Sequence, residues 1–181
     1  MAYLITCANC KTKPVVKNPS QLDRLAFHGT LFVARTQLIK LADIDLDWNY
    51  TLPAWELYSG KRSKLYPQIA EANWKKPCVD INIISALFGW IKHTDLIPYY
   101  DLKMDARKGE KKQLIWRVWQ EMNVLQEVVS PGDIDLLSQL YRKAVNENGL
   151  AVATVPTVRF TDRGVQKGIW LNHQLNNVLC D

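Results

Sequence analysis

Residues 77–90 read PCVDINIISALFGW, and this stretch decides the fold. The valine and isoleucines between 79 and 84 form a short apolar, β-branched run, which predicts a buried strand. Residues 64–75 come before it with apolar side chains at helical spacing, and Pro77 ends that predicted helix. A helix followed by a buried strand is typical of α/β proteins, in which functional loops gather at the carboxyl ends of the strands.

The periodicity of apolar residues predicts the other elements. We expect strands at residues 2–6, 31–34 and 150–161, and helices at 36–41, 111–128, 131–149 and 169–179. Residues 85–104 show neither period and predict a long loop. No internal repeat or linker divides the chain. We therefore expect a single α/β domain over residues 1–181, with a mixed sheet flanked by helices.

The composition is typical of a globular protein. With 48% hydrophobic and 23% charged residues among 181, the chain can bury a sizeable core. The apolar runs are too short to span a bilayer, and the first residues lack the pattern of a signal peptide, so we expect a cytoplasmic protein. Four cysteines are too few and too irregularly spaced for a disulfide framework, so we expect them to be thiols.

The positive charges are clustered. A net charge of +5 and a pI near 9.0 permit a polyanionic partner without requiring one. Three clusters flank the same part of the chain: Lys61, Arg62 and Lys64; Lys75 and Lys76; and Lys103, Arg107, Lys108, Lys111, Lys112 and Arg117. For any one cluster, the alternative explanation is a solubilising surface.

Three short motifs carry residue types with chemical uses. Residues 7–11 read CANCK, at the end of the first predicted strand. Residues 56–60 read ELYSG. The third motif joins ISALFGW at 84–90 to DLIPYYDLKM at 95–104.

The second and third motifs resemble the YaaA-like superfamily. Its members carry an aromatic-Ser/Lys-Gly segment, then a strand ending in Ser-Ala/Gly-aromatic-or-Leu-aromatic-Gly, then a D-x-I-x-P-Y-D/R-L-x-M stretch. Order, spacing and residue types agree over residues 56–104. The first motif has the Cys-x-x-x-Lys spacing that is seen in archaeosine-synthase relatives.

The resemblance implies an α/β fold with a groove that faces DNA or another substrate carrying a nucleobase. Themes of the superfamily are the protection of DNA from peroxide stress and the chemistry of modified bases. If the three motifs meet at the carboxyl ends of neighbouring strands, they form one pocket, in which aromatic faces stack on a base and polar groups read its edge. The expected substrate-binding residues are Asn9, Tyr58, Ser59, Gly60, Ser85, Gly89, Trp90 and Tyr100. The expected contacts to the nucleic-acid backbone are Lys61, Arg62, Lys108, Lys111 and Lys112.

Two kinds of side chain in these motifs can take part in a reaction. Asp101, or else Asp95, can stabilise the positive charge that develops on the sugar when an N-glycosidic bond breaks, or can orient the attacking water. Lys11 can instead be a nucleophile toward the sugar carbon and form a Schiff base once the base has left. We expect a glycosylase-like enzyme that releases a modified base from DNA, in repair or in defence against modified foreign DNA, and that needs no cofactor.

Each of these interpretations has an alternative. Asp101 can instead cap a helical turn or pair with Lys103 or Arg107. Cys7 and Cys10 can form half of a zinc site, but no further ligands stand at a fitting spacing, so we expect no metal. The main alternative function is a DNA-binding stress protein without catalysis, and a third is an enzyme acting on free nucleotides or on a tRNA base.

Overall fold

A four-stranded mixed sheet lies at the centre of the computed structural model, which describes residues 1–146 and 163–180. The strand order is β4 (Gly89–Lys92), β3 (Ile81–Ser85), β1 (Tyr3–Thr6) and β8 (Ile134–Asp135). β1 is parallel to both β3 and β8, whereas β4 runs antiparallel to β3. Every residue of β3 is buried, as expected for an inner strand that is covered on both faces. The predicted α/β class and mixed sheet are confirmed.

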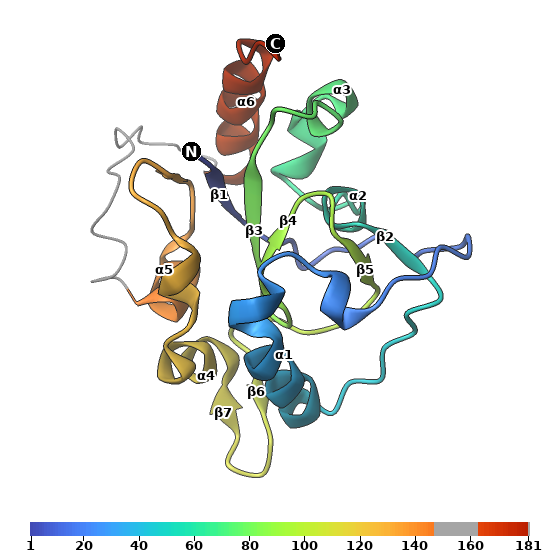
Figure 1. Ribbon diagram of the computed structural model, residues 1–181, viewed down its shortest axis with the longest axis vertical. Helices are drawn as coiled ribbons and strands as arrows, with labels where there is room; N and C mark the ends of the chain where they lie inside the picture. Colours follow the sequence, from blue (N-terminus) through green and yellow to red (C-terminus); the bar gives the residue numbers. More distant parts are fainter. Residues whose placement is uncertain (147–162, 181) are drawn as a thin grey trace.

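Helices and two small antiparallel sheets surround this centre. Figure 1 shows α4 (Ile115–Met122) and α5 (Gln139–Val145) on one side of the sheet, and α2 (Ala54–Leu57) with β2 (Thr51–Pro53) and β5 (Leu96–Pro98) on the other. The chain also forms α1 (His28–Ala42), α3 (Glu71–Trp74), α6 (Arg163–Asn176), and the 3-10 helices η1 (Leu22–Arg24), η2 (Tyr66–Gln68) and η3 (Leu125–Val128). A hairpin of β6 (Arg107–Lys108) and β7 (Gln113–Leu114) projects from the end that carries α1 and α4 (Figure 1).

Some of the predicted elements are wrong, and the structure shows why. The strand predicted at 31–34 belongs to α1, whose buried side chains recur at helical spacing: Leu31, Ala34, Arg35, Leu38 and Ala42. The loop predicted at 85–104 contains β4 and β5. Gly89 closes a tight turn with a φ of 63°, which lets β4 fold straight back on β3.

The helix predicted at 64–75 is reduced to η2 and α3, and the one at 111–128 to α4 and η3. The helix predicted from residue 131 begins only at Gln139, and Asp133 instead binds the start of the chain and the turn before β8. Its carboxylate accepts hydrogen bonds from the N–H groups of Ala2 at 2.8 Å and Ser130 at 2.9 Å, and β8 then pairs with β1. The strand predicted at 150–161 lies outside the described residues.

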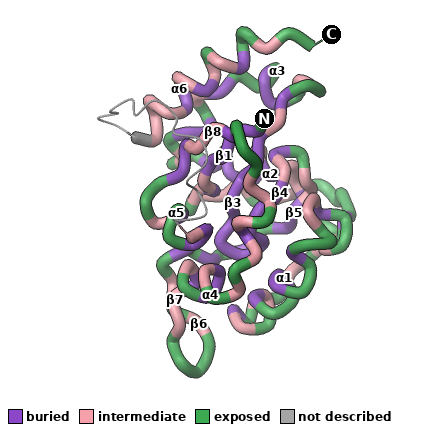
Figure 2. The backbone as a smooth tube through the Cα atoms, turned by 60° about the vertical axis from the view of Figure 1, so that its left-hand side comes forward, coloured by how far each residue is buried: buried purple, intermediate pink, exposed green. Residues whose placement is uncertain are grey.

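A disulfide joins Cys78 to Cys180, so the prediction of four thiols is wrong for this pair. The two residues are 102 positions apart, but α6 packs on α3 and brings their Cα atoms to 5.5 Å. Cys7 and Cys10 are free thiols. Figure 2 shows that burial follows the central strands, whereas the loops and the hairpin tip are exposed. Within residues 1–146 and 163–180, no helix has the length and apolar character needed to cross a membrane.

Candidate functional site

Lys11 follows β1 in a loop that is held closely against α2. The N–H of Thr12 donates a hydrogen bond to the carbonyl of Leu57 at 2.7 Å. Gly60 packs so close to Cys10 that a Cβ at position 60 would lie 2.8 Å from the Cys10 carbonyl oxygen. The missing side chain of Gly60 therefore makes room for the backbone of Cys10, and not for a ligand. This contact fixes the position of the Lys11 backbone.

The side chain of Lys11 lies over two buried tyrosines that come from distant parts of the chain. Its Nζ is 4.4 Å from the centre of the Tyr100 ring and 5.9 Å from the centre of the Tyr58 ring. The hydroxyl oxygens of the two tyrosines are 2.7 Å apart, and that of Tyr100 is 2.8 Å from Ser85 Oγ. All three sequence motifs therefore meet at this place.

The surroundings of Ser85 set the direction of this hydrogen-bonded chain. The backbone N–H groups of Leu87 and Phe88 donate to Ser85 Oγ at 3.2 and 3.0 Å. Because the oxygen accepts these two bonds, its own O–H is the hydrogen that goes to the Tyr100 hydroxyl. Tyr100 in turn donates to Tyr58, so the turn after β3 fixes both tyrosine hydroxyls.

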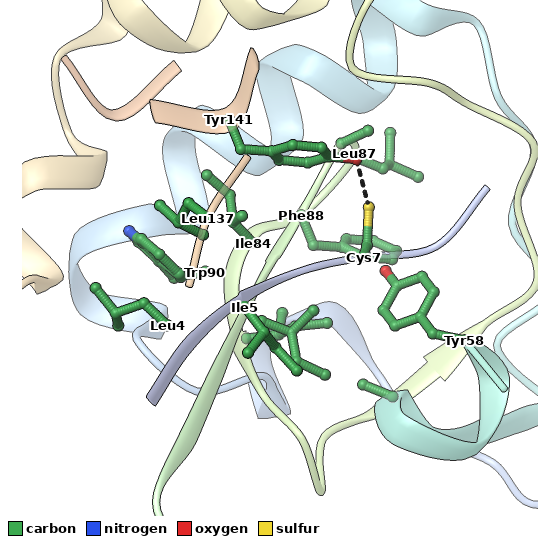
Figure 3. Packing of buried hydrophobic residues seen from close by; sticks show 14 of the residues in the cluster. Leu4, Ile5, Cys7, Tyr58, Ile84, Leu87, Phe88, Trp90, Leu137 and Tyr141 are labelled. Carbon is green, nitrogen blue, oxygen red and sulfur yellow. Dashed lines mark hydrogen bonds between the residues drawn. The ribbon is translucent and has the colours of Figure 1, made fainter. Parts of the chain in front are cut away.

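Further polar groups gather at the carboxyl end of β1. The Cys7 thiol is 3.1 Å from the hydroxyl of Tyr141, and the Tyr58 hydroxyl points toward Cys7 (Figure 3). Tyr66 donates a hydrogen bond to the carbonyl of Thr6 at 2.8 Å. Tyr141 lies within the helix predicted at residues 131–149, and nothing in the helical spacing distinguishes it from a core residue.

Burial sets the protonation of these groups. It lowers the pKa of the Lys11 amine below the ordinary lysine value, and the nearby Cys7 and Asp101 only partly oppose this shift. Burial also raises the pKa of the four tyrosines well above the ordinary value: Tyr58, Tyr66, Tyr100 and Tyr141. At neutral pH the site therefore combines neutral phenols with an amine that loses its proton more easily than a surface lysine does.

Asp101 and Asn9 lie at the exposed side of this cluster. Asp101 is exposed, and its negative charge acts on the Lys11 ammonium. Asn9 is exposed in the same loop as Lys11. The arrangement is thus a half-buried amine with hydroxyl groups behind it and a carboxylate on the solvent side.

Comparison with known proteins gives the family. A family described as "Peroxide stress protein YaaA" matches residues 17–173 of the chain. The chain belongs to this family. The match covers the second and third motifs, with Tyr58, Ser85 and Tyr100, and begins after Lys11. No curated protein matches the chain.

In this member of the YaaA family, Asp95 does not contribute to the cluster around Lys11. Its carboxylate accepts hydrogen bonds from the N–H groups of Ala26 at 2.9 Å and Lys92 at 3.0 Å. It also faces the buried guanidinium of Arg35, whose pKa is lowered by burial to about 10 while the charge of Asp95 opposes the shift. Asp95 therefore holds the β4–β5 turn against α1, and the alternative that it stabilises the charge on the sugar or orients the water stays a prediction.

Arg35 is a buried charge that sequence reasoning missed. Its Nε donates to the carbonyl of Phe88 at 2.9 Å, and its Nη2 donates to the carbonyls of Ala26 at 2.7 Å and Trp90 at 2.6 Å. Arg35 thus holds the turn that follows Ser85. An arginine between apolar helix positions is the signal that could have found it.

Three other residues expected to bind a substrate are engaged in packing. Trp90 is fully buried and donates its indole N–H to the Leu125 carbonyl at 2.8 Å, so it offers no stacking face. A Cβ at Gly89 would meet Leu125 at 2.9 Å, so this glycine makes room for the core. Ser59 donates its hydroxyl to the Trp55 carbonyl at 2.7 Å.

The expected backbone-contacting residues lie in two places. Lys61 and Arg62 are exposed and directly follow Gly60, which packs on the Lys11 loop. Lys108, Lys111 and Lys112 lie on the projecting β6–β7 hairpin, at the lower end of Figure 1. Only the first pair adjoins the cluster around Lys11.

A separate hollow of about 670 Å³ lies beside β4, and its lining includes Trp55, Trp74, Lys76 and His93. None of the site residues predicted from the sequence lines it. Among the described residues, no three side chains of the metal-binding types gather closely enough to hold an ion, and the Cys7 thiol contacts Tyr141 instead.

Proposed function

We propose that this protein releases a damaged or modified base from DNA, and that Lys11 is the reacting group. The observation that carries the proposal is the half-buried Lys11 amine, which has a lowered pKa and lies 4.4 Å from the Tyr100 ring centre and beside the charge of Asp101. An amine with a lowered pKa is the nucleophile that forms Schiff bases at sugar carbons. Peroxide oxidises DNA bases, so base release also fits a family named for peroxide stress.

Lys11 and Asp101 have different roles in the proposed reaction. The Lys11 nitrogen bonds to C1′ of the deoxyribose as the bond from C1′ to the base breaks, and the base leaves with the electron pair and takes up a proton. The sugar ring then opens, its oxygen takes the proton of the amine, and a Schiff base to Lys11 remains until water hydrolyses it. In this scheme the Asp101 carboxylate, whose charge acts on Lys11, stabilises the positive charge on the sugar during the first step.

The surrounding surface supports a polyanionic substrate. Lys61 and Arg62 are exposed next to the Lys11 loop, and Lys103 is close enough for its charge to act on Lys11. These cations can contact the phosphates on either side of a base that is turned out of the duplex.

The test uses duplex oligonucleotides that each carry one oxidised or otherwise modified base. Release of the base is measured as alkali-sensitive sites, and the Schiff base is trapped with borohydride as a covalent protein–DNA complex. We expect Lys11→Ala to abolish trapping and lower base release by about 100-fold or more, and Asp101→Asn to lower release by roughly 100-fold. Lys143→Ala is the matched control, because Lys143 also lies over an aromatic ring, 5.7 Å from Trp116, but is exposed on α5.

DNA binding without catalysis is the second candidate function, and it is favoured by the lysines of the β6–β7 hairpin, of which Lys111 and Lys112 are exposed and Lys108 is half-buried. It predicts that no base is released from any duplex. It also predicts that replacing Lys108, Lys111 and Lys112 by alanine weakens binding and lowers its salt dependence by about three counterions. Asp101→Asn would then leave binding unchanged.

A further inference from the structure

The loop directly after Lys11 exposes two large apolar side chains between two lysines. Residues 13–17 read Lys-Pro-Val-Val-Lys, and we refer to them as the 13–17 loop. Val15 is 86% exposed and Val16 is 73% exposed, while Lys13 and Lys17 are exposed on either side. Neighbouring apolar side chains held in water at a loop tip indicate a surface that contacts something else.

The 13–17 loop is held at both ends and is therefore no loose tail. On one side, the N–H of Thr12 donates to the Leu57 carbonyl at 2.7 Å. On the other, the N–H of Asn18 donates to the Asn49 carbonyl at 2.9 Å, and Asn18 forms a bridge with Tyr50. Figure 1 shows the dark blue segment after β1 running out to the edge of the molecule as a projecting loop.

The 13–17 loop contacts the segment that carries Tyr100 of the cluster around Lys11. Lys13 Nζ lies 5.2 Å from the centre of the Tyr99 ring, and Tyr99 is 37% exposed. Tyr99 stands next to Tyr100, whose ring faces the Lys11 amine. Val15 is four positions after Lys11, so the Cα atoms of the two residues are at most about 14 Å apart.

We propose that Val15 and Val16 form a wedge that enters the base stack of a duplex and fills the space left by the base that turns out toward Lys11. Apolar wedges of this kind unstack base steps, and the cost is offset by contacts to the distorted DNA. Lys13 and Lys17 flank the wedge and contact the phosphates of the opened step. Neighbouring bases of one DNA strand are about 3.4 Å apart. This distance is shorter than the limit of about 14 Å between Lys11 and Val15, so the valines can contact the bases next to the extruded one. The proposal rests on the proposed function, because it assigns a duplex with an extruded base to that site.

The test measures unstacking without requiring the reaction. A duplex carries the fluorescent base 2-aminopurine beside the modified base, and its fluorescence rises when the step is unstacked. We expect the wild type to raise the fluorescence, and the double variant Val15→Ser, Val16→Ser to lose most of the rise at saturating protein. Val33→Ser is the matched control, because Val33 is 67% exposed but lies on α1.

The second readout compares duplex with single-stranded substrate. Single strands need no wedge, so we expect the double variant to slow base release from the duplex by about tenfold or more and to leave the single strand unaffected. Replacing Lys13 and Lys17 by alanine should weaken duplex binding and reduce its salt slope by about two counterions.

The outcomes separate the two proposals. Normal fluorescence and normal duplex release by the double variant would overturn the wedge and leave the proposed function standing. No base release by the wild type, together with a fluorescence rise that depends on the valines, would overturn the proposed function and leave the wedge. The absence of any fluorescence rise with the wild type would overturn the wedge, as would a dimer that dissociates when the valines are replaced, since the tip would then contact a second copy of the chain.

Discussion

The amine of Lys11 lies 4.4 Å from the centre of the Tyr100 ring, although the two residues are 89 positions apart in the chain. The contact has two opposing effects on the amine. The ring face attracts the ammonium form, whereas burial against the ring removes the water that the ammonium form needs. Burial lowers the pKa of Lys11 below the ordinary lysine value. The ring that positions the lysine thus also makes it a better nucleophile.

The first prediction concerns the titration of Lys11. We expect its amine to lose the proton below the ordinary lysine pKa of 10.5, and Schiff-base trapping on aldehyde-bearing DNA to rise with pH through that lowered pKa. The measurement is the NMR shift of reductively methylated lysines, with Lys11→Arg used to assign the signal. An amine of Lys11 that titrates at or above the ordinary value would contradict the site as described.

The same shift has a consequence for stability. Since the folded state binds the Lys11 proton less tightly than the unfolded chain does, the unfolded chain holds more protons between the lowered pKa and 10.5. The free energy of unfolding should therefore gain from Lys11 as the pH rises through this window, and lose that gain at lower pH. Lys11→Met should remove this part of the pH dependence.

A second prediction tests the hydrogen-bonded chain at Ser85. Ser85→Ala removes one of the two hydrogen bonds of the Tyr100 hydroxyl and takes the Ser85 acceptor from the buried N–H groups of Leu87 and Phe88. We expect a loss of roughly 1–3 kcal/mol in the free energy of unfolding, measured with urea, and a weaker shift of the Lys11 pKa. Ser59→Ala removes only one bond to a carbonyl, that of Trp55, at a half-buried position, and should cost less than about 1 kcal/mol. Equal losses in the two variants would contradict this account.

The sequence predicted the inner strands well because burial leaves a direct signal in them. The isoleucine-rich run became β3, and the N-terminal run became β1, with β-branched and other large apolar side chains facing the core. The three motifs also meet, as the α/β interpretation requires, because two of them follow the ends of these parallel strands. The prediction from periodicity failed at residues 31–34. Four consecutive apolar residues resemble a strand there, and the helical pattern shows only when the buried positions up to Ala42 are included.

Roles within the site could not be predicted from residue types. Asp95 and Asp101 stand in the same motif, yet one carboxylate holds a turn beside Arg35 and the other faces Lys11 from solvent. Trp90 and Gly89 are likewise placed by contacts with Leu125, a residue 35 and 36 positions later in the chain. Such assignments depend on contacts between distant segments, and local spacing does not contain them.

A third prediction concerns the buried guanidinium of Arg35. Arg35→Met removes the donor of two buried carbonyls and one part-buried carbonyl, and it removes the charge that faces Asp95. We expect the free energy of unfolding to fall by about 3–5 kcal/mol, as found when one member of a buried charged pair is removed. Lys40→Met, at an exposed position of the same helix, should change it by less than about 0.5 kcal/mol. A small loss at Arg35 would show that its bonds contribute little.

A fourth prediction tests the covalent link between α6 and the segment after α3. Cys180→Ser removes the disulfide that closes a loop of about 100 residues and constrains the unfolded chain. It should lower the free energy of unfolding by about 2–5 kcal/mol. The wild type in reductant should match the variant, and Cys10→Ser should match the oxidised wild type. In the unfolded protein without reductant, mass spectrometry after alkylation should find two labelled cysteines and, after reduction, four. Four labels before reduction would contradict the link.

The last prediction separates backbone strain from packing at Gly89. Gly89 and Gly132 both have a positive φ, of 63° and 90°, so replacing either by alanine costs about 1–2 kcal/mol from the backbone alone. A Cβ at Gly132 meets nothing within 4 Å, whereas one at Gly89 lies 2.9 Å from a Leu125 methyl and 3.0 Å from the Trp119 ring. Both neighbours are buried and packed, so they cannot move aside freely, and overpacking adds about 1–3 kcal/mol. Urea denaturation should therefore rank Gly89→Ala well below Gly132→Ala in stability. The turn at Gly89 also positions the N–H groups that donate to Ser85, so Gly89→Ala should reduce Schiff-base trapping at Lys11. If Gly89→Ala and Gly132→Ala had equal effects on stability and on trapping, the link between this turn and the site would be refuted.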